Sequence, residues 1–188
     1  GPDGNLPIHA ACLKYKKKVI NFFLSYDKNL LNETNINSVN GYQILAALDE
    51  NLLIYYLSEY PPINIHHKDS QGRTLLVTYL LFNKYDDLNF AKKLKKYGCS
   101  LLYPKDVNSL YFLLEKSCDL LMDLSKIFEI DVNNLHYNIP ISFSTLYKND
   151  LTCLKTLVKL GLDLNLENEK DNLVSLAIKE RNINFLEY

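Results

Sequence analysis

Apolar residues recur along this chain at the three- and four-residue spacings of short amphipathic helices. Ile20, Phe23 and Leu24 form one such set, and the stretch from Leu154 to Val158 carries the same spacing. These spacings place side chains on one face of a helix. The apolar runs are short and polar turns separate them, so the pattern predicts an all-α fold of short helices.

The predicted helices come in pairs. Residues 43–48 and 52–60 form one pair, and residues 110–115 and 120–128 form another. Two prolines follow residue 60 directly and end the first pair, because proline cannot continue a helix. A single pair cannot bury its apolar side alone, so we expect the pairs to stack on one another.

A faint internal period of about 33 residues supports this stacking. Its opening appears at residues 4–12 and again at residues 69–76. Its closing signature appears as Asp131-Val132-Asn133 and, 32 residues later, at residues 163–165. A period of this length is typical of repeated supersecondary units.

The openings resemble the ankyrin repeat. The family pattern is Gly-x-Thr-Pro-Leu-His-x-Ala-Ala, and Pro7, Ile8 and His9 fill its central positions. Later openings keep fewer of these residues, as with Gly72 and Thr74. The resemblance implies an all-α ankyrin-repeat solenoid of stacked helix-turn-helix units with short β-hairpin fingers. It also implies that His9 makes hydrogen bonds near the start of its helix and has no catalytic role.

The resemblance extends over nearly the whole chain, which we expect to be one domain over residues 1–188. The predicted repeats span approximately 1–35, 36–67, 68–104, 105–136, 137–168 and 169–188. The third repeat carries extra residues near 84–88, which we place in the loop between its helices. Gly1-Pro2 resembles the remnant of a cleaved tag, and the chain stops inside a predicted helix. We therefore expect a fragment of a longer protein.

Six leucines are the predicted core residues of these repeats: Leu76, Leu80, Leu110, Leu114, Leu157 and Leu160. Exposed lysines near the first repeat, Lys14 and residues 16–18, are expected to make its outer side polar.

Composition narrows the possible partners. The formal net charge is −1 and the isoelectric point is near 6.5, which argues against bulk electrostatic binding of nucleic acid. No apolar run is long enough for membrane insertion. The four cysteines, at positions 12, 99, 118 and 153, form no Cys-x-x-Cys motif. We expect all four to be reduced thiols in an intracellular protein, cytoplasmic or nuclear.

The sequence offers little chemistry. His66 and His67 are adjacent, and adjacent side chains of an extended segment point to opposite sides, so the pair is a poor metal site. No phosphate-binding loop, dinucleotide fingerprint or nucleophile elbow is present. We therefore predict no cofactor, no metal and no enzymatic activity.

The 14 tyrosines are the more informative residues. Most are expected to pack between helices, as at Tyr55, Tyr56 and Tyr79. Tyr42, however, falls at a junction between finger and helix, where we expect exposure. Tyrosine is favoured at recognition surfaces because it offers a large contact area and a hydroxyl.

The predicted partner-binding residues lie in the fingers or at their junctions with helices. They are Tyr42, His67, Lys68, Gln71, Arg73, Tyr103, Lys105, His136 and Tyr137. If successive fingers project on one side, these side chains form a mixed basic and aromatic strip that fits an acidic or polar peptide segment. The alternative is that they are ordinary solvated turn residues.

These observations favour a protein–protein interaction module, acting as an adaptor or scaffold, which binds another protein on its concave finger and inner-helix surface. The alternative functions are a non-catalytic regulatory or targeting domain of a larger enzyme and a purely structural spacer. The sequence leaves the oligomeric state open.

Overall fold

The computed structural model describes residues 3–83, 88–101, 107–133, 135–136 and 139–188. These residues form α-helices, one 3-10 turn and one two-stranded hairpin, which confirms the predicted all-α class. The chain divides into two compact units, Gly1–Ser100 and Leu101–Tyr188. The predicted loop insertion near residues 84–88 falls largely outside the described residues.

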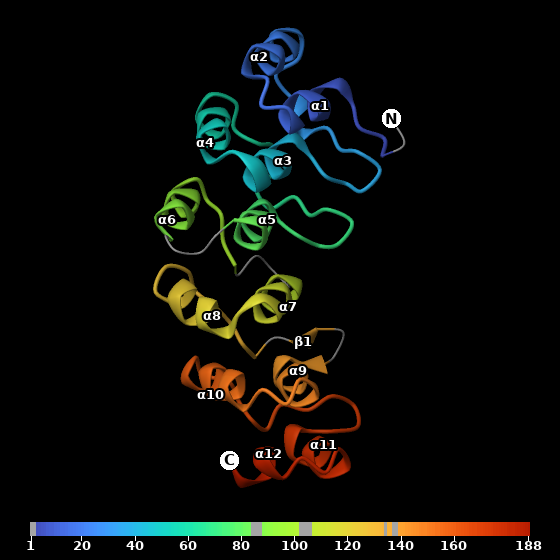
Figure 1. Cartoon of the computed structure of the whole chain (residues 1–188), viewed down its shortest axis with the longest axis vertical. Coiled ribbons are helices and arrows are strands. Elements are labelled where there is room, and N and C mark those ends of the chain that lie inside the picture. Colours follow the sequence, from blue (N-terminus) through green and yellow to red (C-terminus); the bar gives the residue numbers. More distant parts are fainter. Residues whose placement is uncertain (1–2, 84–87, 102–106, 134, 137–138) are drawn as a thin grey trace. The chain divides into compact units, whose positions relative to one another are not determined.

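Unit 1 is built from three helix pairs. An inner helix and an outer helix alternate along the chain, and the inner helices lie in one row beside the row of outer helices (Figure 1). The inner helices are α1 (Pro7–Leu13), α3 (Gly41–Leu48) and α5 (Leu75–Phe82). The outer helices are α2 (Lys17–Tyr26), α4 (Glu50–Glu59) and α6 (Asn89–Lys96), and a 3-10 turn, η1 (Leu30–Asn32), follows α2.

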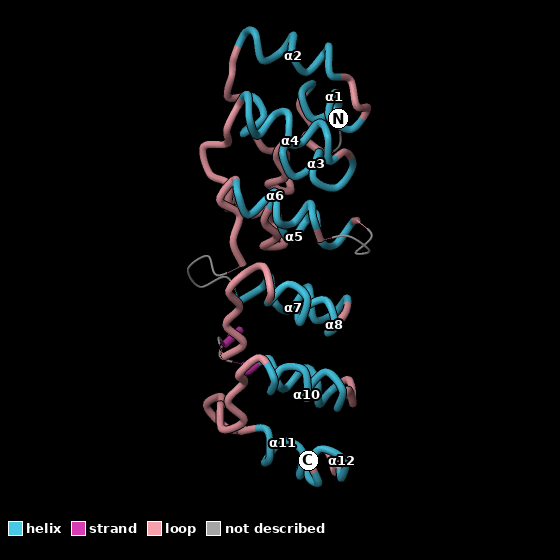
Figure 2. Tube along the Cα trace, turned by 90° about the vertical axis from the view of Figure 1, so that its left-hand side faces the viewer, coloured by secondary structure: helices cyan, strands magenta, loops and turns pink. Residues whose placement is uncertain are grey.

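Unit 2 has the same alternation. Its inner helices are α7 (Val107–Lys116), α9 (Ile141–Tyr147) and α11 (Leu173–Lys179). Its outer helices are α8 (Cys118–Ser125), α10 (Leu151–Lys159) and α12 (Ile183–Glu187). One finger forms an antiparallel hairpin of β1 (Leu135–His136) and β2 (Ile139–Pro140). Figure 2 shows the helices of each unit as short segments joined by long loops.

Polar residues fix where the helices begin. The Asn40 side chain accepts the Gln43 N–H at 3.0 Å at the start of α3, and Asp150 accepts the Cys153 N–H at 2.8 Å at the start of α10. Each bond satisfies a backbone donor that the first helical turn leaves unpaired. Short polar side chains therefore set the helix boundaries.

The core of each unit is apolar, as the helical spacing predicts. Five of the six predicted core leucines are buried, and Leu160 is half-buried. Tyr56 and Tyr79 are buried between helices as predicted, and Tyr55 is half-buried. Gly72, Gly98 and Gly161 take positive φ angles at the predicted turns, where glycine alone avoids strain.

Two of the asparagines that close a period connect one repeat to the next. The Asn133 side chain donates to Gly161 O at 3.0 Å and accepts the Asp163 N–H at 2.8 Å. In unit 1, Asn32 accepts the Ile63 N–H at 2.9 Å. The closing signature in the sequence thus marks a hydrogen bond between successive repeats.

The prediction of four reduced thiols is wrong for one pair. Cys118 on α8 and Cys153 on α10 form a disulfide, with Cα atoms 5.4 Å apart and a separation of 35 positions in sequence. The stacking of α10 on α8 brings together two cysteines that belong to different repeats, so no local motif marks the pair. Cys12 and Cys99 are free and buried.

Candidate functional site

Two fingers of unit 1 are built around side chains that accept backbone hydrogen bonds. In the first finger, residues 33–40, the Asn35 side chain accepts the N–H groups of Asn37 and Val39, both at 3.0 Å. In the second finger, residues 64–74, the Asp69 side chain accepts the N–H groups of Gln71 and Arg73, at 3.0 and 2.9 Å. Each finger is therefore a tight turn folded around one buried or half-buried polar side chain.

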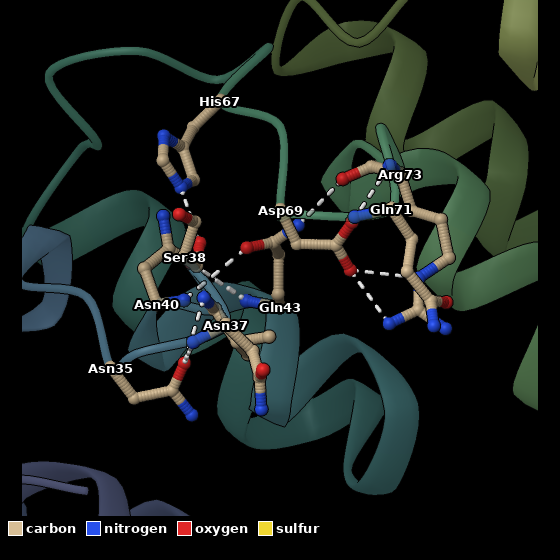
Figure 3. A network of polar contacts seen from close by, with 10 residues as sticks. Asn35, Asn37, Ser38, Asn40, Gln43, His67, Asp69, Gln71 and Arg73 are labelled. Atoms are coloured by element: carbon tan, nitrogen blue, oxygen red, sulfur yellow. Dashed lines mark hydrogen bonds and ion pairs between the residues drawn. The ribbon is translucent and has the colours of Figure 1, made fainter. Parts of the chain in front are cut away.

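The two fingers are joined to each other and to α3 (Figure 3). His67 Nε2 lies 2.7 Å from Ser38 O, and the Ser70 N–H donates to Asn37 O at 2.9 Å. Gln43 of α3 donates from Nε2 to Arg73 O at 2.7 Å. These bonds hold the second finger in one orientation against the first.

Arg73 forms an ion pair with Asp69 of the same finger. Both Nε and one terminal nitrogen of Arg73 lie 2.7 Å from Asp69 Oδ2. Asp69 is buried, and only 20% of the Arg73 side chain is exposed. The guanidinium also lies 5.9 Å from the centre of the Phe82 ring, which is exposed on α5. Two nitrogens of the Arg73 guanidinium are thus engaged inside the finger.

The first repeat confirms the structural role predicted for His9. Its Nδ1 accepts the Leu6 N–H at 3.1 Å, so the ring proton lies on Nε2, which donates to Glu33 O at 2.8 Å. His9 is buried. It ties the start of α1 to the beginning of the first finger.

One predicted site residue is not at the surface. The expectation that Tyr42 is exposed is wrong: Tyr42 is buried, and its hydroxyl donates to Tyr60 O. Burial raises the pKa of the Tyr42 hydroxyl. The residue follows Asn40 by only two positions, but the start of α3 already faces the core there, as the buried Gly41 beside it shows.

The other predicted residues of the second finger lie together. Gln71 is exposed, and His67, Lys68 and Arg73 are half-buried. Tyr103, Lys105 and Tyr137 lie outside the described residues, and of His136 only its place on β1 is described. The continuous strip across all fingers therefore stays a prediction.

Two apolar residues that sequence reasoning missed lie beside this finger. Leu48 and Phe82 are the eighth residues of α3 and α5, and both are exposed. The ends of these helices are adjacent, because Asn83 donates from Nδ2 to Ala46 O at 2.9 Å. Alignment of the two inner helices from their first residues would have revealed apolar side chains at the same position.

The described residues offer little for catalysis or metal binding. No group of three His, Cys, Asp or Glu side chains among them is arranged to hold a metal ion. Burial raises the pKa values of the Cys12 and Cys99 thiols to about 12, so both stay protonated and are weak nucleophiles. None of the helices in the described part of the chain is both long enough and apolar enough to cross a bilayer.

Comparison with solved structures identifies the fold. No protein-family model matches the sequence, and no curated protein does. The ankyrin repeat domain of Bcl-3 aligns over 100% of this chain and 84% of its own, at 16% identity and a TM-score of 0.72. The human ASB11 ankyrin repeat domain aligns over 97% and 81%, at 15% identity and a TM-score of 0.62.

A third similar structure is the Bd0816 predatory endopeptidase from Bdellovibrio bacteriovorus in complex with immunity protein Bd3460. It aligns over 98% of this chain and 96% of the matched chain, at 16% identity and a TM-score of 0.61. The helix pairs, the fingers and these likenesses agree with the motif at Pro7 to His9. The chain has the ankyrin-repeat fold.

Proposed function

We propose that this chain is a protein–protein interaction module whose binding surface in unit 1 combines the second finger with the ends of α3 and α5. The observation that supports this most directly is the finger itself. Its backbone is fixed by Asp69, Gln43 and His67, while Gln71 at its tip is exposed. A rigid turn that presents an exposed amide binds at low entropic cost, because its conformation is set in advance.

The surface fits an extended peptide of mixed character. The amide of Gln71 can both donate and accept hydrogen bonds. The guanidinium N–H groups that Arg73 does not use for Asp69 lie next to the exposed ring of Phe82, and Leu48 extends the apolar area along the helix ends. We infer that the partner places an apolar side chain over Leu48 and Phe82 and an acidic or polar group near the finger.

We extend this proposal to the later fingers. Tyr103, Lys105, His136 and Tyr137 belong to them by sequence, and aromatic residues are frequent anchors of protein interfaces. These residues would give unit 2 its own part of the partner-binding surface.

Affinity capture with the immobilised chain, followed by quantification of the captured partner, tests the proposal. The double variant Gln71→Ala and Phe82→Asp is expected to weaken binding by about tenfold or more, as loss of interface anchors does. Because both side chains are exposed, the thermal midpoint stays unchanged. Lys93→Glu, on the outer face of α6, is the matched surface control and leaves binding intact.

Two results would contradict the proposed location. Full binding by the double variant would exclude the surface formed by the finger and the helix ends. Loss of binding in Lys93→Glu alone would move the site to the outer helices. Arg73→Glu is a poor probe, because it would leave Asp69 buried beside a second negative charge and unfold the finger.

One comparison favours a second candidate function, that of a regulatory domain that binds an enzyme. The Bdellovibrio structure is a complex of an endopeptidase with an immunity protein. A captured partner with catalytic activity that changes on binding would distinguish this role from that of an adaptor or scaffold. We also propose an intracellular location, cytoplasmic or nuclear, which now rests on the free thiols of Cys12 and Cys99 alone, because Cys118 and Cys153 form a disulfide. Fluorescence imaging of the tagged chain would test it, and a secreted chain would contradict it.

A further inference from the structure

The disulfide of unit 2 lies where two outer helices begin. Cys118 is the first residue of α8 and Cys153 is the third residue of α10, and these helices are neighbours in the outer row of unit 2 (Figure 1). Buried leucines also pack both helices into the core: Leu120, Leu121 and Leu124 of α8, and Leu154 and Leu157 of α10. The helices therefore stay adjacent when the bond is open, with the two cysteines side by side.

The two cysteines differ in exposure. Cys153 is 3% exposed, whereas Cys118 is half-buried. Exchange between a thiol and a disulfide proceeds by direct attack of a thiolate on a sulfur atom, so it depends on which sulfur can be reached. A small molecule from solvent therefore reacts at Cys118, and Cys153 reacts only with Cys118.

The start of α8 favours a reactive thiolate at Cys118. A helix N-terminus carries unpaired N–H groups and a partial positive charge, which stabilise a thiolate. At the start of α10 the Asp150 side chain accepts a backbone N–H at 2.8 Å, but Ser117 makes no such bond to the first turn of α8. The side chains that flank Cys118 in sequence, Lys116 and Asp119, carry opposite charges, so neither sign dominates. No capping side chain of Ser117 thus competes for the first-turn donors of α8.

The other two cysteines serve as internal references. Cys12 and Cys99 are at most 3% exposed and lie in unit 1. Burial raises the pKa of both thiols to about 12, so neither is a ready thiolate. Oxidation of the native chain is therefore confined to Cys118 and Cys153.

We propose that Cys118 is a reversible modification site of the reduced chain, which forms a mixed disulfide with a small thiol such as glutathione, and that Cys153 resolves it into the internal bond. The ratio of small disulfide to small thiol around the chain then sets the fraction of the chain in which this bond is closed. Unit 2 thereby reports the redox state of its surroundings, and an internal disulfide is compatible with an intracellular location.

The two steps balance in atoms and electrons. The Cys118 thiolate attacks one sulfur of the small disulfide, breaks its S–S bond and releases one small thiolate. The Cys153 thiolate then attacks the Cys118 sulfur and releases the second small thiolate. The two cysteines lose two electrons and two protons in all, and the small disulfide takes them up as two thiols.

Redox titration of the full chain tests this. The chain is fully reduced, equilibrated in buffers with rising ratios of oxidised to reduced glutathione and quenched with acid. Alkylation and peptide mass spectrometry then show the state of each cysteine. The Cys118 and Cys153 thiols are expected to disappear together as the ratio rises and to return completely in excess reduced glutathione, while Cys12 and Cys99 keep their thiols throughout. A bond that persists in excess reduced glutathione overturns the proposal, and so do thiols that stay free in the most oxidising buffer.

The variant Cys153→Ser gives the decisive result, because it removes the resolving thiol. It is expected to accumulate one glutathione at Cys118, whereas Cys118→Ser is expected to react at Cys153 at least about tenfold more slowly, since that sulfur is hard to reach. Circular dichroism melting checks that each variant is folded, and a rapidly quenched time course of the wild type captures the same mixed disulfide without any substitution. A mixed disulfide on Cys153 rather than Cys118, in the variants or in the time course, overturns the proposal.

Discussion

The two units build the same helix-pair repeat but hold successive repeats together by different means. In unit 1 the links are buried polar side chains, such as Gln43 to Arg73 O at 2.7 Å and Tyr56 to Asn21 at 2.8 Å. In unit 2 a disulfide joins Cys118 to Cys153, whereas an asparagine bond between repeats occurs in both units, at Asn32 and at Asn133. The apolar helix faces are common to both units, so they define the fold, while the polar and covalent links vary.

This comparison teaches which contacts are interchangeable. A buried hydrogen bond contributes about 0.5–1.5 kcal/mol net, whereas burial of a leucine contributes about 1.5–3 kcal/mol. We therefore expect both units to depend first on their leucines. The contacts that matter next should differ: the disulfide in unit 2 and the buried polar hydrogen bonds in unit 1. The variants below test this in order of expected effect.

Leu157→Ala is expected to have the largest effect. Leu157 is fully buried in α10, and removal of a buried leucine side chain costs about 2–5 kcal/mol. Urea denaturation measures the loss, and hydrogen exchange is expected to rise first in unit 2. Val174→Ala, at an exposed position, is the control. A loss below about 1 kcal/mol would show that Leu157 lies outside the core.

Reduction of the disulfide is expected to lower the stability of unit 2 by about 2–4 kcal/mol, because the bond closes a long loop in the unfolded chain. Thermal melting with and without dithiothreitol measures this. Cys118→Ser should already melt at the lower temperature and should not respond to dithiothreitol. Four titratable thiols in the unreduced, denatured protein would contradict the disulfide.

Gln43→Ala is expected to lower the stability of unit 1 by about 1–3 kcal/mol. Gln43 is buried and bonds both Arg73 O and the Asn40 N–H, which the variant leaves unpaired. Denaturant unfolding is again the measurement, with Asn51→Ala on the exposed side of α4 as the matched control. Equal stability of both variants would show that the finger network is dispensable.

The smallest expected effect is a gain in both units. Tyr15 and Arg181 take positive φ angles of 53° and 52° directly after the last turn of their inner helices, where most residues pay about 1 kcal/mol or more. Glycine at either position should raise the melting temperature. Asn149→Gly, at the same position after α9, should change it less, because asparagine tolerates this conformation. Equal gains at all three positions would contradict this explanation.

Much of the fold follows from short-range patterns. The three- and four-residue spacing around Ile20 and Leu157 is enough to predict buried helix faces, since helix geometry alone sets which side chains share a face. The structural role of His9 followed from its motif in the same way. Leu160 is the exception, because it is the C-cap residue that follows the last residue of α10.

The site is harder to predict, because it depends on contacts between residues far apart in sequence. Tyr42 is buried because of how α3 begins against the rest of the core, which the polar residues around it do not show. Arginine is a residue type that often anchors interfaces, but the guanidinium of Arg73 is already ion-paired with the Asp69 carboxylate. Cys118 and Cys153 are joined only through the stacking of two repeats. In each case the decisive partner comes from the tertiary packing.

The asparagine bonds between repeats have a consequence for how such a chain can change in length. Asn133 reaches residues 28 and 30 positions later, and Asn32 reaches a residue 31 positions later. A deletion of one whole period brings the next equivalent residues to about the same spacing from Asn32 or Asn133. A deletion that is one or two residues longer or shorter changes this spacing and leaves the asparagine side chain without its backbone partner. Gain or loss of complete periods by recombination is therefore the route to shorter or longer forms that still fold.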